Sequence, residues 1–578
     1  MRQQYAIRST IIVVGLVLAV LAVIAQMIRI QSSDQAKVFI SQGDRYAGEF
    51  QTFYPERGEI YDRNGHLLAG NRTVYEVGVS LSEMDSPDSL ANVLSKYLGL
   101  TYDDVHKKLT ESPKSWEYVV IQDYVGVETV DQLQKLILQM KDAGDTRLSG
   151  ISFKPHFQRS YPENALASNV LGFVTRDDRG YFGIEEKYND LLAGNPVQVW
   201  VPRDPNKATE IPKVPNGTTL VLTLNRDLQA KVESILDKAL SDYGSNNGTI
   251  IVMNPRNGEI LAMAATPRMD LNNYGNYFTL YDDGSQYNRA IGMSYEPGSV
   301  LKVLTMAAAL DTGTVRPETT FLDTGSIEVG GITIQNWNRD AWGQQDMVGC
   351  LQHSLNVCLA WISSQMGTQS FYSYMGRFGL GHPTGVDLSG EAAGRLKVPG
   401  DGDWYPVDLG TNAFGQGVAV TPLQMLMAVS AVANDGKMVT PHVLYSMLRD
   451  GHQYNVPTQI AGSPITAQTA HTLNQMLTAS LEQESSQALL PGYRLAGKTG
   501  TAQIPTEYGY DPTHTNASFV GWGPADDPQF MVYIWLESPA ASIWASETAA
   551  PVFSKVAEQA VILLNIPPDA VRGQFVTK

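Results

Sequence analysis

The hydrophobic residues of the chain begin in one long run near the N-terminus. Residues 11–25 carry no polar side chain, and the apolar run continues past Gln26, so that it occupies the 21 residues from Thr10 to Ile30. A helix rises about 1.5 Å per residue, so a run of this length just spans a bilayer core of roughly 30 Å. Because Arg2 and Arg8 precede the run, we expect residues 1–9 to be a cytoplasmic tail and the chain after about residue 31 to be exported.

A cleaved signal peptide is the alternative interpretation of this run. Signal peptides usually have an apolar region of about 7–15 residues and a cleavage site of small residues. Residues 23–25 resemble a weak site of this kind, but the apolar stretch continues beyond them. We therefore expect an uncleaved anchor over residues 10–30. The rest of the sequence has no second run of spanning length, which predicts a single-pass protein.

The polar and apolar pattern after the anchor indicates a first domain over residues 38–201. The Asn-Gly pair at 64–65 separates two strand-like stretches and predicts a two-residue hairpin turn, since such a turn needs positive φ. Helical and extended periodicities follow one another beyond it. The expected elements are helices at 89–98, 130–143, 165–171 and 184–193 and a strand at 150–159.

Four prolines and several charges between residues 202 and 218 predict a linker. After it, strand-like and helical patterns indicate a second domain over 219–567, followed by a tail at 568–578. The segment 530–537 is almost entirely apolar, as expected of a strand covered on both faces. The expected strands are 219–224, 248–253, 259–264, 494–504, 517–522 and 530–537, and the expected terminal helices are 227–243 and 547–564.

Early and late strands with helices between them predict an α/β fold of the α+β type. In this fold a mainly antiparallel sheet is flanked by helices. The composition agrees with packed domains, because 43% of the 578 residues are hydrophobic and 17% are charged. The net charge of −17 argues against a general nucleic-acid-binding protein, which needs a basic face.

The chain has only two cysteines, Cys350 and Cys358. Their scarcity fits an exported protein that avoids thiols. They are eight positions apart in a segment of helical pattern, which would separate them by about 12 Å. That distance exceeds the roughly 7 Å limit for a disulfide, so we expect both to remain unpaired.

A Ser-x-x-Lys motif at 299–302 opens an apolar helical pattern. Pro297 and Gly298 precede Ser299, so the serine should lie at a helix start, where backbone N–H groups favour developing negative charge. Lys302 then lies on the same helix face, one turn away. A lysine whose pKa is depressed by apolar surroundings can accept a serine proton. On its own the motif is better explained by a helix cap beside a solvated lysine, because both residue types are common on protein surfaces.

Two further motifs change this interpretation. Ser354-Leu355-Asn356 lies in a helical segment, and Lys498-Thr499-Gly500-Thr501 lies on a predicted late strand. In this order, Ser-x-x-Lys, Ser-x-Asn and Lys-Thr-Gly are the signature of penicillin-binding proteins and class A β-lactamases.

Each residue type has a role in acyl transfer. Ser299 would attack a carbonyl carbon, with Lys302 as its base. Ser354 would relay a proton to the leaving amine, and Asn356 would orient Lys302 or hold a substrate amide. Lys498 with the hydroxyls of Thr499 and Thr501 would bind a substrate carboxylate. Gly500 would allow close approach of a substrate backbone, and the N–H groups of Ser299 and Thr501 would stabilise an oxyanion.

With these motifs the sequence resembles the class B penicillin-binding proteins, the monofunctional peptidoglycan D,D-transpeptidases. The resemblance covers nearly the whole chain, including the first domain, which is similar to the family's pedestal, or dimerisation, domain. The further segments that carry it are 57–65, 159–162, 183–185, 415–417, 421–424, 518–521 and 549–553.

The resemblance implies attack by Ser299 on the D-Ala-D-Ala end of a stem peptide, then transfer to an amine of a neighbouring strand. It implies that β-lactams acylate the same serine and that a RodA/FtsW-type glycosyltransferase is the membrane partner. We expect no cofactor, and no metal site either, because the histidines lack His-x-x-x-His or Cys-x-x-Cys companions. The resemblance places the protein in the bacterial cytoplasmic membrane. The second motif of the family is often Ser-Ser-Asn, and here Leu355 takes the place of the central serine. The context at 354–357 and the stretch at 378–381 look more like the division type than the elongation type.

A β-lactamase-like hydrolase and a β-lactam sensor remain the alternatives. A class A β-lactamase needs a Glu-x-x-Leu-Asn motif between the second and third motifs, and the sequence has none there. A sensor should be coupled to a cytoplasmic signalling domain, whereas residues 1–9 predict only a tail. A Ser-His-Asp hydrolase would need a Gly-x-Ser-x-Gly elbow, which is absent. His353, beside Ser354, is then interpreted as a residue on a helix surface.

Overall fold

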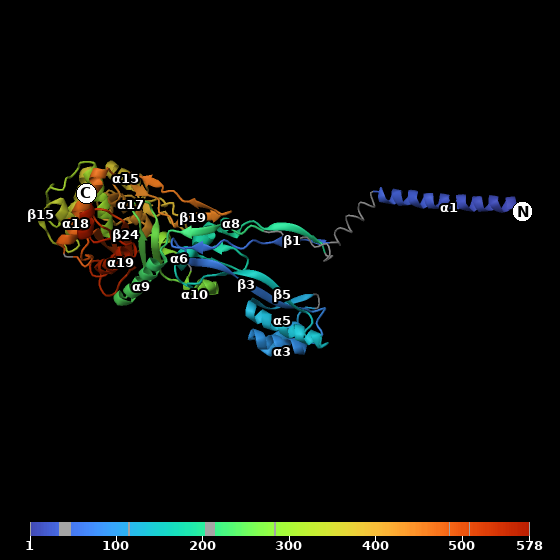
Figure 1. The fold of residues 1–578 in the computed structure, drawn as a ribbon. Coiled ribbons are helices and arrows are strands. Elements are labelled where there is room, and N and C mark those ends of the chain that lie inside the picture. Colours follow the sequence, from blue (N-terminus) through green and yellow to red (C-terminus); the bar gives the residue numbers. More distant parts are fainter. Residues whose placement is uncertain are drawn as a thin grey trace. The chain divides into compact units, whose positions relative to one another are not determined.

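The computed structural model describes residues 2–33, 48–113, 116–202, 214–282, 285–484, 486–507 and 509–576 (Figure 1). The chain divides into two compact units. The first comprises Met1–Glu56 with Gly194–Asn216, and the second comprises Arg57–Ala193 with Gly217–Lys578.

The first unit contains the predicted apolar helix and a two-stranded ribbon. Helix α1 (Arg2–Gln31) includes 22 residues, Thr10–Gln31, that are long and apolar enough to cross a membrane. The ribbon pairs β1 (Gly48–Phe53) with β8 (Val197–Pro202) in antiparallel register. Most of the predicted linker, residues 203–213, lies outside the described residues.

The second unit opens with the predicted hairpin. Strands β2 (Ile60–Tyr61) and β3 (Leu67–Ser80) pair antiparallel around Gly65, whose φ is +87°. The N–H of Asp62 donates to the carbonyl of His66, so three residues, not the expected two, form the loop. After two-residue loops, the next commonest hairpin connection is a three-residue loop with glycine in the left-handed conformation.

Strand β3 also pairs with β4 (Tyr118–Gly126) and with β5 (Ile151–Ser160). Helices α3 (Pro87–Leu98), α4 (Tyr102–Thr110) and α5 (Val127–Asp142) bury Leu90, Leu94, Val105 and Leu133 in one apolar cluster with Val77 and Val79 of β3. The serine and threonine side chains at Ser86 and Thr101 cap α3 and α4, which satisfies backbone N–H groups that a helix start leaves unpaired.

Three of the segments that carry the family resemblance meet in one buried ion-pair cluster. Glu185 is completely buried and accepts hydrogen bonds from Arg57 Nε at 2.8 Å and Arg159 Nε at 2.7 Å. The expected helix over 184–193 is interrupted at Tyr188, where α7 (Gly183–Lys187) ends before α8 (Asn189–Ala193). Shorter elements nearby are α6 (Ser168–Leu171), β6 (Phe173–Val174) and β7 (Gly180–Tyr181).

One sheet joins this region to the rest of the second unit. Its strand order is β20-β19-β9-β2-β3-β4, with β5 also paired to β3. Strand β9 (Thr219–Leu222) runs parallel to β2 and antiparallel to β19 (Leu444–Arg449), which pairs with β20 (His452–Asn455). The N-terminal hairpin and the C-terminal two thirds of the chain therefore share backbone hydrogen bonds.

The second sheet confirms the predicted antiparallel α+β fold. Its order is β11-β10-β24-β23-β22, and every pairing is antiparallel. The strands are β10 (Asn247–Met253), β11 (Ile260–Ala265), β22 (Ala496–Thr506), β23 (Gly509–Gly523) and β24 (Phe530–Glu537).

Both faces of this sheet are covered by helices. Phe530, Val532 and Ile534 of β24 pack with α9 (Arg226–Tyr243) and α19 (Ala549–Leu563) (Figure 1). The alternate residues Met531, Tyr533 and Trp535 belong to a second cluster. That cluster includes α12 (Lys302–Asp311), α14 (Asn356–Met366), α17 (Pro422–Ala433) and α18 (Ala467–Gln483). The prediction of a strand buried on both faces at 530–537 is confirmed.

The remaining elements surround these two sheets. They are η2 (Leu271–Asn276), α10 (Tyr277–Leu280), α11 (Arg289–Gly292), η3 (Gly298–Leu301), β12 (Phe321–Asp323), β13 (Ser326–Val329), β14 (Ile332–Gln335), β15 (Gly343–Gln345), α13 (Met347–Gln352), α15 (Thr368–Arg377), β16 (Arg395–Leu396), α16 (Asp408–Asn412), β17 (Val418–Ala419), β18 (Met438–Val439), β21 (Ile460–Gly462) and α20 (Asp569–Val576).

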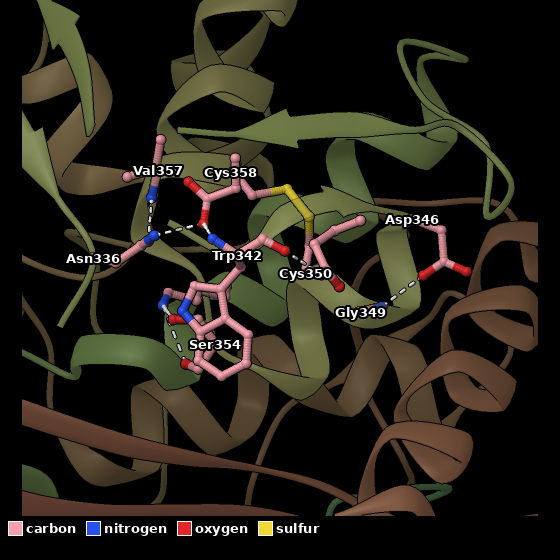
Figure 2. Close-up of a disulfide and its surroundings, with 11 residues drawn as sticks. Asn336, Trp342, Asp346, Gly349, Cys350, Ser354, Val357 and Cys358 are labelled. Atoms are coloured by element: carbon pink, nitrogen blue, oxygen red, sulfur yellow. Dashed lines mark hydrogen bonds between the residues drawn. A yellow bond between two sulfur atoms is a disulfide. The ribbon is translucent and has the colours of Figure 1, made fainter. Parts of the chain in front are cut away.

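The prediction that the two cysteines stay unpaired is wrong. Cys350 and Cys358 form a disulfide, with their Cα atoms 6.1 Å apart (Figure 2). The expected separation of about 12 Å assumed one continuous helix. The chain instead leaves α13 at Gln352, turns, and starts α14 at Asn356, which brings the two cysteines together.

Candidate active site

The serine of the first motif lies where a tight helical turn enters a buried helix. Ser299 is the second residue of η3, which runs directly into α12 at Lys302. Gly298 has a φ of +58°, and a Cβ atom there would come within 2.7 Å of the carbonyl oxygen of Thr501. The glycine is therefore required both for the backbone turn and for the close contact with β22. Ser299 lies in the first turn of the helical segment, as expected, and is partly exposed.

Lys302 is completely buried, and its amine contacts the second motif. Its Nζ donates to the backbone carbonyl of Ser354 at 2.5 Å, to Ser354 Oγ at 3.1 Å and to Asn356 Oδ1 at 2.8 Å. Burial, followed by the charge of Lys498, holds the pKa of Lys302 well below its usual value. The three acceptors fix where the amine lies, and the lowered pKa favours its neutral form.

The second motif occupies the turn between α13 and α14. Ser354 has a φ of +51°, a left-handed conformation that is uncommon for a residue other than glycine. The N–H of Leu355 donates to the carbonyl of Cys350 at 3.0 Å, and Leu355 is completely buried. Asn336 Oδ1 accepts from the N–H of Val357 at 3.2 Å (Figure 2). Core packing and local hydrogen bonds thus hold Ser354 and Asn356 toward Lys302.

The third motif lies on the edge strand β22, next to the serine turn. Lys498 is buried, which lowers its pKa to about 8, although the carboxylate of Glu484 acts in the opposite direction. Its Nζ donates to Thr499 Oγ1 at 3.2 Å and to the Thr499 carbonyl at 3.3 Å. The hydroxyl of Thr501 accepts from the N–H of Ala545 at 3.1 Å. The first and third motifs therefore meet at one place, with two buried lysines.

A glycine is needed at position 500 for a different reason from the expected approach of a substrate backbone. A Cβ atom at this position would lie 2.3 Å from Ser518 Oγ, 2.6 Å from Val300 Cγ2 and 2.8 Å from the carbonyl oxygen of Pro297. The close approach is thus made by the serine turn of the chain itself.

A carboxyl group that the sequence reasoning missed lies beside the serine turn. Glu296 Oε1 accepts hydrogen bonds from the N–H of Gly417 at 2.9 Å and from the hydroxyl of Tyr510 at 3.2 Å. Burial raises the pKa of Glu296. This residue ties the serine turn to the loop at 415–417 and to the β22–β23 hairpin. Its position three residues before Ser299 was the available signal.

The sequence did not single out two tryptophans near the second motif, and it predicted His353 on a helix surface. Trp337 and Trp544 make an edge-to-face contact with ring centroids 5.0 Å apart, and Trp337 Nε1 donates to the carbonyl of His353 at 3.2 Å. His353 follows α13, stacks on Trp342 at 4.2 Å and has a pKa lowered by burial. It is therefore a packed residue of the turn before the second motif, not one on a helix surface.

The three motifs thus lie next to one another, because Lys302 contacts the second motif and the serine turn packs against the third. Ser299 is partly exposed, so its hydroxyl is accessible to a substrate. A partly exposed hydroxyl, a buried amine with a depressed pKa one turn away, and a second buried lysine can support nucleophilic acyl transfer on a substrate that carries a carboxylate.

Comparisons with known proteins match both halves of the chain. The model of the penicillin binding protein transpeptidase domain matches residues 248–558, and that of the penicillin-binding protein dimerisation domain matches residues 52–215. Stage V sporulation protein D of Bacillus subtilis is 32% identical over 89% of this chain and 79% of its own length. The probable peptidoglycan D,D-transpeptidase PbpC of Pseudomonas aeruginosa is 28% identical over 97% of this chain and 96% of its own length.

The chain is also similar to a solved structure of a penicillin binding protein. The crystal structure of penicillin binding protein 3 from Mycobacterium tuberculosis, complexed with aztreonam, superposes with a TM-score of 0.69 at 26% identity. The match covers 90% of this chain and 98% of that one.

Proposed function

The chain belongs to the class B penicillin-binding proteins, the serine-type peptidoglycan D,D-transpeptidases, and we propose that Ser299 is its acylated nucleophile and Lys302 the base. The contact of the buried Lys302 amine with Ser354 and Asn356 is the observation that carries this assignment. It joins the first and second motifs in one place, and burial lowers the pKa of the amine, which favours the neutral form that accepts a proton.

In the proposed acylation, the Ser299 oxygen attacks the carbonyl carbon between the two terminal D-Ala residues of a stem peptide. Lys302 takes the hydroxyl proton, and the developing oxyanion lies against the N–H groups of Ser299 and Thr501. The C–N bond then breaks, and Ser354, which is hydrogen-bonded to Lys302, passes a proton to the leaving D-Ala amine. Asn356 holds Lys302 in place.

In deacylation, the amine of a neighbouring strand attacks the ester carbon and forms the new amide bond. The amine loses a proton to Lys302 through Ser354, and the Ser299 oxygen leaves and regains its proton. Lys498, with the hydroxyls of Thr499 and Thr501, binds the terminal carboxylate of the donor peptide. By similarity to the aztreonam complex of penicillin binding protein 3, β-lactams acylate the same serine.

Labelling of the full-length protein in detergent with a fluorescent penicillin tests this assignment. We expect a covalent adduct on Ser299, identified by peptide mass, and no adduct in Ser299→Ala. Ser364→Ala is the matched control, because Ser364 lies in α14 with its hydroxyl bonded to the carbonyl of Ala360, and it should label like the wild type. Equal labelling of Ser299→Ala would overturn the assignment.

A second assay distinguishes a transpeptidase from the hydrolase alternative. A stem peptide ending in D-Ala-D-Ala is supplied with and without an amine acceptor, and released D-Ala and joined peptide are both measured. We expect joined peptide to form with the acceptor. Release of D-Ala without any joined product, under every acceptor tested, would favour the hydrolase.

We further propose that α1 anchors the protein in the bacterial cytoplasmic membrane with its N-terminus inside. On this proposal residues 38–201 are the pedestal domain, residues 202–218 the linker and residues 219–567 the transpeptidase domain, all outside the membrane. A reporter enzyme that works only outside the membrane should then be active when fused after Lys578. An inactive fusion, together with activity of a second reporter that works only in the cytoplasm, would contradict the topology.

The membrane partner that the family suggests is a RodA/FtsW-type glycosyltransferase. Co-purification should recover it with the full-length protein. A variant whose α1 is replaced by an unrelated spanning helix should lose part of that binding if the anchor makes the contact.

A further inference from the structure

The only two cysteines of the chain enclose the second motif. Cys350 lies in α13, Cys358 lies in α14, and their disulfide closes a loop that contains residues 351–357. Figure 2 shows the bond connecting the two helices, with Ser354 on the turn between them. Both cysteines are completely buried, so the bond is part of the core and not of the surface.

All three acceptors of the Lys302 amine lie inside this loop. They are the carbonyl and hydroxyl oxygens of Ser354, at 2.5 and 3.1 Å, and Asn356 Oδ1, at 2.8 Å. The disulfide therefore closes around the part of the chain that contacts Lys302.

The sequence of this segment favours a different local structure. Its helical pattern predicts one continuous helix, in which Cys350 and Cys358 would be about 12 Å apart. The observed Cα separation is 6.1 Å, and Ser354 takes a left-handed φ of +51°. Such a conformation persists only where the surroundings hold it. The disulfide excludes the continuous helix, because the bond cannot span its length.

We propose that the Cys350–Cys358 disulfide is a positioning element for acylation, which holds Ser354 and Asn356 against the amine of Lys302. This inference rests on the proposed roles of Ser299 and Lys302. Without the bond, α13 and α14 can shift toward a straighter arrangement, and the three acceptors move away from Lys302. Water then reaches the amine and reduces the burial that lowers its pKa.

Full-length Cys350→Ala/Cys358→Ala protein tests the proposal, with the fluorescent-penicillin acylation rate constant measured from pH 5 to 10. We expect the rate constant at pH 7 to fall by about 10- to 100-fold, since misplacement by about 1 Å has effects of that size. The acid limb of the profile should move to higher pH, because a better-hydrated Lys302 is protonated over a wider range. Each single substitution should equal the double one, because either breaks the same bond.

Leu94→Ala is the matched control for a general loss of stability. Leu94 is completely buried on α3, in a different apolar cluster from the motifs, so its truncation should lower the melting temperature and leave the rate constant and acid limb unchanged. The rate constant comes from the time course of labelling, so misfolded protein lowers only the final labelled fraction. Cys350→Ala/Cys358→Val, which restores part of the lost volume, is the second variant if the first folds poorly.

The proposal would be overturned if the cysteine variants had a lower melting temperature but kept the acylation rate constant and the acid limb of the wild type. The wild type and Ser299→Ala are labelled in parallel. Equal labelling of these two would refute the proposed nucleophile, a result that is separate from any effect of the cysteine variants.

Discussion

At the scale of single residues, the site depends on two lysines that the fold removes from water. Burial, followed by the charge of Lys498, lowers the pKa of Lys302, and burial lowers the pKa of Lys498 to about 8. The roles proposed for them have opposite requirements, because a base must be neutral and a carboxylate-binding residue must be charged.

The pH dependence of the acylation rate constant should reflect the titration of both Lys302 and Lys498. The rate constant should rise with pH as Lys302 loses its proton, because only the neutral amine accepts the serine proton. It should fall above about pH 8, where Lys498 becomes neutral and no longer attracts the carboxylate. Stopped-flow labelling with a fluorescent penicillin from pH 5 to 10 measures both limbs.

Lys498→Arg identifies the alkaline limb. A guanidinium stays charged far above pH 10, so the limb near pH 8 should disappear even if the changed side-chain geometry lowers the rate constant as a whole. Persistence of that limb in Lys498→Arg would assign it to another group.

Lys302→Ala should lose acylation while the protein stays folded. Loss of a general base has an effect of about 10²- to 10⁴-fold, and the cavity and the unsatisfied acceptors on Ser354 and Asn356 will also lower stability. Circular dichroism and melting establish that the variant is folded. Lys238→Ala, which removes one member of an exposed pair with Asp242, should acylate normally. A folded Lys302→Ala protein with wild-type kinetics would refute the role of base.

At the scale of elements, the site depends on how closely β22 packs against η3. The space above Gly500 is filled by Ser518, Val300 and Pro297, and the space above Gly298 is filled by Thr501. Two glycines therefore let a strand and a helical turn approach at backbone distance, and this contact sets where Lys498 lies relative to Ser299.

Gly500→Ala should separate these two elements. A Cβ atom 2.3 Å from Ser518 Oγ and 2.8 Å from a backbone oxygen requires a backbone shift. Overpacking of this kind destabilises by about 1–3 kcal/mol, and we expect acylation to slow at least about 10-fold. Gly376→Ala in α15 is the control, because its Cβ would have nothing within 4 Å. Normal acylation by Gly500→Ala would show that the contact does not set the geometry.

At the scale of the whole molecule, the second unit is held together across the predicted domain boundary. The β2–β9 pairing places early and late strands in one sheet. Beside it, Glu185 binds Arg57 and Arg159 with almost no solvent access. Burial opposes ionisation of Glu185, but the two guanidinium groups outweigh it and hold its pKa below the usual value.

Glu185→Gln should strongly destabilise this unit. The substitution leaves two buried arginines without their counter-charge, and breaking a buried ion pair in this way costs about 3–5 kcal/mol. Urea unfolding followed by tryptophan fluorescence measures the effect. Asp242→Asn breaks the exposed pair with Lys238 and should change stability by less than about 1 kcal/mol. A similarly small effect of Glu185→Gln would show that the cluster contributes little.

Much of the protein could be predicted from its sequence because the relevant signals are local. The 21-residue apolar run and the periodicity of the strands and helices depend on neighbouring positions, and each of the three motifs is a short local pattern. They predicted α1, the antiparallel sheet with β24 buried on both faces, and Ser299 in the first turn of a helical segment. The types and order of the motif residues also indicated the family that the comparisons show, and the roles of the individual residues are proposals.

Only the tertiary structure decided how these pieces meet. The helical pattern around Cys350 and Cys358 predicted a continuous helix, but the core interrupts it at 353–355 and pairs the cysteines. The burial of Lys302, the role of Glu296 and the meeting of Arg57, Arg159 and Glu185 also involve residues distant in sequence. Local periodicity carries no information on such contacts, because they depend on which elements pack together and on the water that this packing excludes.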